Sequence, residues 1–178
     1  MKYIWKQVLF GIIFGFILGL FLITTAHAES IEATFGGLTY HLVNHDEVSE
    51  LFANKIGDSG KLIYTGLLGF GLSSDHYTYR MFVGENSIGE FMFGSTVSYT
   101  WKLSVFRLGP IVGFYNQDDS KFIAKGIKPF SFGFGIVPII GADLSMKLLT
   151  FDENKYVKLN TIITPVVINQ TISLGMEL

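Results

Sequence analysis

From residue 30 onward, apolar and polar side chains alternate along the chain, and stretches rich in Gly, Asn, Asp and Ser separate the alternating segments. Successive side chains of a β-strand point to opposite faces, so a period of two predicts strands, and no stretch keeps the longer period of a helix. The pattern predicts eight strands, near residues 31–44, 61–74, 77–84, 90–101, 104–116, 134–148, 155–167 and 171–178. The chain beyond residue 30 is therefore expected to be all β.

Segment 90–101 indicates which face of the sheet meets its surroundings. One face carries large apolar side chains, namely Phe91, Phe93, Val97, Tyr99 and Trp101. The opposite face carries Glu90, Met92, Gly94, Thr96, Ser98 and Thr100. An apolar outer face with aromatic residues near the strand ends is typical of a barrel in lipid, whereas a soluble barrel or sandwich turns its apolar face inward.

The connectors favour the same architecture. Those after the first, third and fifth predicted strands (45–60, 85–89 and 117–133) fall on one side, and those after the second, fourth and sixth are short. Bacterial outer-membrane barrels have short periplasmic turns and longer outer loops. We therefore expect one domain, an eight-stranded antiparallel transmembrane β-barrel.

Residues 1–28 have the pattern of a secretory signal peptide. Lys2 and Lys6 precede a long apolar run that ends at Ala26-His27-Ala28, so we expect cleavage after Ala28 and a barrel formed by residues 29–178. Removal of the two lysines leaves 11 Lys and Arg against 15 Asp and Glu, a net charge near −4. This charge gives no basic field for nucleic acid, and the lack of cysteine excludes disulfides and thiolate metal sites. The expected location is the Gram-negative outer membrane.

The predicted inward side chains form two groups. Near the periplasmic strand ends they are charged, and we expect a charged floor made of Glu32, Arg80, Arg107, Asp143, Lys147 and Glu177. Nearer the outer ends they are apolar or small: Ile63, Leu67, Gly69, Gly71, Phe82, Met92, Gly94, Gly113, Val137, Ile139 and Ile162. Eight strands enclose room for packed side chains or one small ligand. The upper interior is thus either a slot for a hydrocarbon chain or a filled core.

Three prolines, Pro110, Pro138 and Pro165, fall inside predicted strands, and each removes a hydrogen bond from the sheet. Such positions are either weak seams that let a lipid enter sideways, or bulges and strand ends.

Gly36-Gly37 can host a β-bulge that turns Leu38, Tyr40 and Leu42 outward and Thr39, His41 and Val43 inward. Without that bulge His41 would face lipid.

Four short motifs follow one another along the chain: Tyr40-His41, Gly69 to Ser73, Asn86-Ser87 and Tyr99-Thr100-Trp101. In order and approximate spacing they resemble motifs of the lipid A palmitoyltransferase family of Gram-negative outer membranes. The resemblance implies transfer of an acyl chain from a phospholipid to lipid A or a related glycolipid, without a cofactor, by essential His, Asp and Ser residues. His41 would be the general base and Ser87 a hydroxyl partner or nucleophile, with loop amides around Gly84 and Gly89 stabilising the oxyanion.

The chain departs from the family at important positions. Asn86 stands where the family has its acid, so that role would fall to Glu85 or Asp46, or be lost. Inward Thr100 replaces a glycine that sets pocket depth in the family, so we expect a chain shorter than palmitoyl. Between Glu29 and the first predicted strand there are almost no residues, where the family has an amphipathic helix, so we expect the clamping of the barrel in the membrane to differ. We expect the pocket to be lined by Leu67, Phe82, Met92, Gly94, Thr100 and Ile139.

Two other function classes remain open. A passive barrel for membrane integrity, adhesion or surface shielding predicts that His41 and Ser87 lie apart in a filled interior, whereas the acyltransferase predicts convergence above an apolar slot. A lipid A deacylase is a weaker hypothesis, since no strand face carries the His-x-Ser alternation of that class.

His41 and His45 lie four apart on an extended chain and do not converge, so we expect no metal site. The expected partners are membrane lipids, and the expected state is a monomer.

Overall fold

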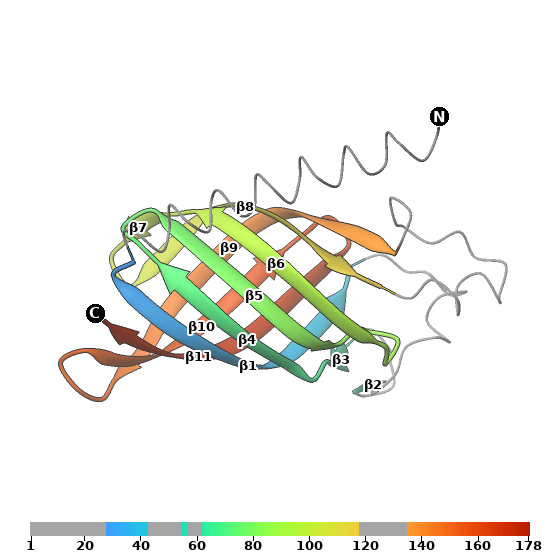
Figure 1. Cartoon of the computed structure of the whole chain (residues 1–178), viewed down its shortest axis with the longest axis horizontal. Coiled ribbons are helices and arrows are strands. Elements are labelled where there is room, and N and C mark those ends of the chain that lie inside the picture. Colours follow the sequence, from blue (N-terminus) through green and yellow to red (C-terminus); the bar gives the residue numbers. More distant parts are fainter. Residues whose placement is uncertain (1–27, 43–54, 57–61, 118–134) are drawn as a thin grey trace, which may run out of the picture.

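The computed structural model describes residues 28–42, 55–56, 62–117 and 135–178, which form one antiparallel sheet closed on itself (Figure 1). Its strands are β1 (Ser30–His41), β2 (Lys55–Ile56), β3 (Leu62–Tyr64), β4 (Leu67–Ser73), β5 (Tyr77–Glu85), β6 (Phe91–Tyr99), β7 (Trp101–Leu103), β8 (Phe106–Asn116), β9 (Ile136–Thr150), β10 (Lys155–Ile163) and β11 (Val167–Glu177). The wall consists of β1, β4, β5, β6, β8, β9, β10 and β11, and the pairing of β1 with β11 closes it. The predicted eight-stranded antiparallel barrel is confirmed.

The barrel has two distinct ends. At the end we call the turn end, short connections join β4 to β5, β7 to β8 and β9 to β10, and the Leu178 amide donates to the Glu29 carbonyl at 2.8 Å. At the opposite end, the loop end, lie the end of β1, the loop 86–90 after β5 and the turn 164–166 after β10. The predicted signal peptide and Asp46 fall outside the described residues. No helix in the described ranges is long and apolar enough to cross a membrane.

The outside of the wall is apolar. Large side chains in the outward register of β5, β6 and β7 are 39 to 66% exposed, namely Tyr77, Met81, Val83, Phe91, Phe93 and Trp101. Tyr79 and Val97 belong to the same register and pair with each other, although both are buried. Because the interior carries buried charges, this arrangement reverses that of a soluble barrel. It is the architecture of a barrel whose outer face contacts lipid.

A bulge in β1 decides which way its last residues point. The register with β11 shifts between Phe35 and Leu38, and Gly36 has a φ of 67°, a left-handed conformation that favours glycine. Beyond the bulge Leu38 and Tyr40 are exposed outside, while Thr39 is buried inside. The predicted bulge is confirmed.

Two predicted element boundaries are wrong. The fourth predicted strand continues through β7, so the hairpin turn lies at residues 104–105, where Ser104 has a φ of 60°. The seventh ends at Ile163, and Pro165 lies in a turn instead of a strand. The Thr164 hydroxyl accepts hydrogen bonds from the amides of Val166 and Val167, and proline suits such a turn because it needs no amide donor.

Two buried ion pairs cross the middle of the interior, and we call Glu32, Arg80, Asp143 and Lys158 the ion-pair layer. Arg80 Nη1 donates to Asp143 Oδ2 at 2.7 Å, and Lys158 Nζ donates to Glu32 Oε1. All four side chains are at most 7% exposed. Ser98, Asn160 and Tyr156 add hydrogen bonds to these four side chains.

The predicted charged floor is therefore present, with a different membership. Lys147 and Glu177 pair at the turn end with both side chains about half exposed, and Arg107 donates to backbone carbonyls there. Lys158 was missed. The sequence does indicate its position, because Lys158 lies between outward Val157 and Leu159 and the alternation therefore turns it inward.

Candidate functional site

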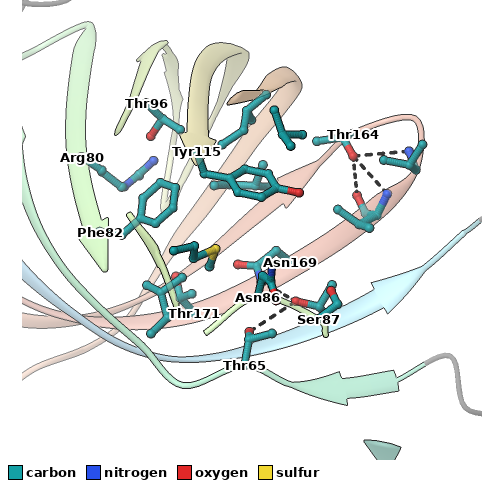
Figure 2. Close-up of a pocket in the computed structure, with 18 of the residues that line it drawn as sticks. Thr65, Arg80, Phe82, Asn86, Ser87, Thr96, Tyr115, Thr164, Asn169 and Thr171 are labelled. Carbon is teal, nitrogen blue, oxygen red and sulfur yellow. Dashed lines mark hydrogen bonds between the residues drawn. The ribbon is translucent and has the colours of Figure 1, made fainter. Parts of the chain in front are cut away.

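On the loop-end side of the ion-pair layer, the interior holds a cavity of about 420 Å³ (Figure 2). This volume lies in the range of small-molecule pockets, about 300 to 1,000 Å³. Most of its lining is apolar, contributed by Leu67, Phe82, Met92, Val137, Ile139 and Ile162. The cavity therefore has the chemistry of a site for a hydrocarbon chain. Four of the predicted pocket residues, Leu67, Phe82, Met92 and Ile139, are in this lining.

Gly94 and Thr100 do not line the cavity. A Cβ on Gly94 would lie 2.5 Å from the Phe82 ring and from the Phe114 carbonyl oxygen, so the glycine makes room for a ring and not for a ligand. Thr100 lies near the turn end, where its amide donates to the His76 carbonyl at 2.7 Å. Eight residues separate it from Met92, about 27 Å of strand. The inner end of the cavity is formed instead by Thr34, Arg80 and Thr96.

His41 and Ser87 meet at the mouth of the cavity. His41 Nε2 lies 3.0 Å from Ser87 Oγ, although 46 residues separate them and β4 lies between β1 and β5 in the wall. The contact forms because the bulge turns His41 inward and loop 86–90 brings Ser87 over the interior. Both residues line the cavity. An imidazole within hydrogen-bond distance of a serine hydroxyl is the arrangement of a base and a nucleophile.

Asn86 holds the loop that carries Ser87. Its Oδ1 accepts hydrogen bonds from the amides of Ile88 at 3.1 Å and Glu90 at 3.0 Å. Backbone bonds close the same turn, from the Asn86 amide to the Glu90 carbonyl and from the Gly89 amide to the Asn86 carbonyl. The Gly89 amide is thus already engaged, contrary to its expected role as an oxyanion donor. Gly84 lies within β5, opposite Leu67 on β4 and Met92 on β6.

The acid expected from the resemblance is not among the described residues at this site. Glu85 is exposed on the outward face, in register with exposed Phe91, and does not line the cavity. Asp46, the other candidate, falls outside the described residues. No Asp or Glu occurs among the described lining residues, and the described chain holds no group of three or more possible metal ligands.

One side of the cavity wall is polar, and the sequence reasoning missed it. Asn169 Nδ2 donates to Thr39 Oγ1 at 2.8 Å, and Thr39 Oγ1 lies 3.4 Å from Thr65 Oγ1. Figure 2 shows Asn169 and Thr65 close to Asn86 and Ser87 at one end, with Arg80 and Thr96 at the other. Asn169 pairs with Thr39 in the register of β1 with β11, and this register follows from the position of the bulge in β1.

The strand pairing of the wall is interrupted beside the cavity. The pairing of β10 with β9 stops at Ile163 opposite Ala142, whereas β9 continues to Ile136 at the loop end. No described strand pairs with residues 136–141 on that side. Pro138 and Ile140, which have outward positions on this stretch, nevertheless line the cavity. The cavity therefore borders this break in the strand pairing, between β9 and the turn 164–166.

Comparisons with known proteins give likeness of fold. No protein-family model matches the chain, and no curated protein matches it. The N-terminal β-barrel domain of Pseudomonas aeruginosa OprF is 14% identical, covers 85% of this chain and 98% of its own, and has a TM-score of 0.45. A de novo designed transmembrane β-barrel is 10% identical, covers 85% and 97%, and has a TM-score of 0.48. Neisserial surface protein A is 9% identical, covers 85% and 98%, and has a TM-score of 0.35.

None of these three is named as a palmitoyltransferase, so the resemblance drawn from the motifs stays a prediction. Likeness at these identities says nothing of substrate or activity. The closed eight-stranded antiparallel barrel is established by the strand pairing of this chain itself.

Proposed function

We propose that the protein is an outer-membrane barrel that takes one acyl chain of a membrane lipid into the loop-end half of its interior and transfers that chain through Ser87. The observation that carries the proposal is the contact of His41 Nε2 with Ser87 Oγ at the mouth of an apolar cavity. The apolar outer face supports the location in the membrane. The break in strand pairing beside β9 supports entry of a chain sideways from the bilayer.

The chemistry divides into two steps. Ser87 Oγ attacks the ester carbonyl of the phospholipid chain while its proton passes to His41 Nε2. The lysophospholipid leaves with that proton, and the chain remains as an ester on Ser87. The acceptor hydroxyl then gives its proton to His41 and attacks the Ser87 ester, which restores the serine hydroxyl. Such general base catalysis contributes about 10²- to 10⁴-fold in rate. The resemblance adds lipid A or a related glycolipid as the acceptor.

A non-enzymatic barrel is the second candidate, and a specific observation favours it. The residue before Ser87 is a carboxamide whose oxygen is used to close its own loop, and Glu85 points to the outside. The polar partners of the site then serve to rigidify the loop end, and the barrel acts in membrane integrity, adhesion or surface shielding. The fold that the comparisons report fits this candidate as well as the first.

Mass spectrometry of lipid A and phospholipids from cells that express the protein distinguishes the two. The same measurement is made on Ser87→Ala and His41→Asn, with His76→Asn at the turn end as a matched control and outer-membrane fractionation of every variant. Transfer predicts lipid A heavier by one acyl group and an increase in lysophospholipid, both lost in Ser87→Ala and His41→Asn and kept in His76→Asn. If the wild type and the three variants all reach the outer membrane and the lipids are unchanged, acyl transfer is refuted and the non-enzymatic barrel is the remaining candidate.

A further inference from the structure

The side-chain amide of Asn86 is held in one orientation. Its Oδ1 accepts from two backbone amides, those of Ile88 and Glu90, and only an oxygen can accept both. The Nδ2 group must therefore occupy the other position, since a flipped amide would set its own hydrogens against those donors. The orientation of the donor group follows from the turn and needs no ligand to fix it.

This fixed donor is buried and has no partner in the described part of the chain. Asn86 is 7% exposed, and its Nδ2 makes no hydrogen bond there. Asn86 lines the cavity beside Ser87. A buried donor left without an acceptor is destabilising, because it has lost its hydrogen bonds to water. An acceptor on a bound molecule at the mouth of the cavity would remove that penalty.

We infer that Asn86 Nδ2 donates to the carbonyl oxygen of the ester that links the bound acyl chain to its lipid. The inference rests on the proposed function for the presence of that ester. An acyl chain in the apolar cavity, with its carbonyl carbon at Ser87, puts the carbonyl oxygen within the reach of the neighbouring side chain. When Ser87 attacks, negative charge develops on this same oxygen, and the amide donor then stabilises the oxyanion.

The inference reverses what the resemblance implies for this position. If Asn86 stood for a lost acid, then Asn86→Asp would restore activity. In the geometry described above, the aspartate keeps one oxygen for the amides of Ile88 and Glu90 and so keeps the turn. Its second oxygen, however, replaces the donor and faces the carbonyl oxygen with a negative charge. Asn86→Asp should therefore weaken ester binding and slow transfer.

A binding experiment tests this inference without any need for turnover. The probes are two phospholipids with the same chains, one ester-linked and one ether-linked, in the same detergent micelles. Their affinities are measured on Ser87→Ala protein, which cannot cleave the ester, with and without Asn86→Asp. Glu85→Gln in the same background removes a nearby carboxylate that faces outward. Folding of each variant is checked by heat-modifiable migration.

We expect the Ser87→Ala protein to bind the ester lipid about three- to tenfold more tightly than the ether lipid, as one neutral hydrogen bond provides. Asn86→Asp should abolish this preference while ether binding stays within twofold, and Glu85→Gln should keep it. In Ser87 protein, Asn86→Asp should slow acylation about 10²- to 10³-fold. Equal affinity of the Ser87→Ala protein for the two lipids would overturn the inference. An ester preference or an acylation rate that stays the same or rises on Asn86→Asp would overturn it as well. If no acylation occurs but the ester preference is intact, only the proposed acyl transfer is overturned, and the hydrogen bond from Asn86 stands.

Discussion

The depth of the cavity predicts the length of the acyl chain. Along β5 the lining runs from Asn86 to Arg80, and along β1 from His41 to Thr34, which are separations of six and seven residues. At about 3.3 Å per residue and a strand tilt of about 40°, the separation on β5 corresponds to about 15 Å along the barrel axis. The separation on β1 corresponds to about 15 to 18 Å, because the bulge adds one residue that the partner strand β11 does not match. Single carbon–carbon bonds of about 1.5 Å at about 111° advance an extended chain by about 1.25 Å per carbon, so about twelve to fourteen carbons fit.

The inner end of the cavity can be raised by one substitution. Thr96 is 1% exposed, and its hydroxyl has no hydrogen-bond partner in the described chain, so replacing it loses no hydrogen bond. Thr96→Met extends the side chain by two bonds, about 2.5 Å, and should shorten the preferred chain by about two carbons. Forcing extra methylenes into a packed site costs about 1–3 kcal/mol, which is a selectivity of about 5- to 150-fold. Ile139→Ala is the control, because it widens the wall without moving the inner end.

The assay follows release of p-nitrophenol from esters of even chain length, from octanoyl to stearoyl, in one detergent. Wild type should react fastest with dodecanoyl or tetradecanoyl esters, Thr96→Met with decanoyl or dodecanoyl esters, and Ile139→Ala with the same esters as wild type. Displacement of a fluorescent fatty acid from Ser87→Ala protein gives the chain-length order without turnover. A preference for palmitoyl in wild type, or no shift in a folded Thr96→Met protein, would refute the depth argument.

Two further predictions concern stability, measured as the free energy of unfolding from lipid vesicles in urea. Arg80→Ala leaves buried Asp143 without its cation and should destabilise the barrel by about 3–5 kcal/mol, whereas Lys147→Ala breaks an exposed pair and should cost about 0–1 kcal/mol; equal losses would contradict the burial argument. Gly36→Ala places a side chain at a positive φ and should destabilise by about 1–2 kcal/mol, whereas Gly66, with open space and no positive φ, should tolerate alanine. A neutral Gly36→Ala would show that the bulge relaxes freely.

The barrel could be predicted from the sequence because the alternation is a property of each strand alone. The bulge was also within reach, since Gly36-Gly37 is the place in β1 where the apolar positions change face. The turn at Pro165 was harder, because the alternation of β10 gives no sign that pairing stops at Ile163. What ends that strand is a threonine hydroxyl that holds two amides.

The site could be predicted only in part. The contact of His41 with Ser87 joins a strand end to a loop across an intervening strand. The alternation of apolar and polar residues predicts neither the position of that loop nor the contact. The expectation that Thr100 lines the pocket comes from the resemblance, in which this position sets pocket depth, together with its inward face; its distance along the chain from Met92 instead puts it near the turn end. Glu85 and Asn86 face opposite sides, as the alternation of β5 requires, so Asn86 and not the acidic Glu85 reaches the interior.

The ion-pair layer has a consequence for the permeability of the membrane. A second hollow, of about 540 Å³, lies on its turn-end side, lined by Lys102, Arg107 and Glu177 among others. The barrel is therefore hollow at both ends and closed between them by side chains that are hydrogen-bonded to one another across the axis. Water and ions that enter either end meet these paired, hydrogen-bonded charges before they can reach the other hollow. We therefore expect the barrel to span a membrane without acting as an open pore.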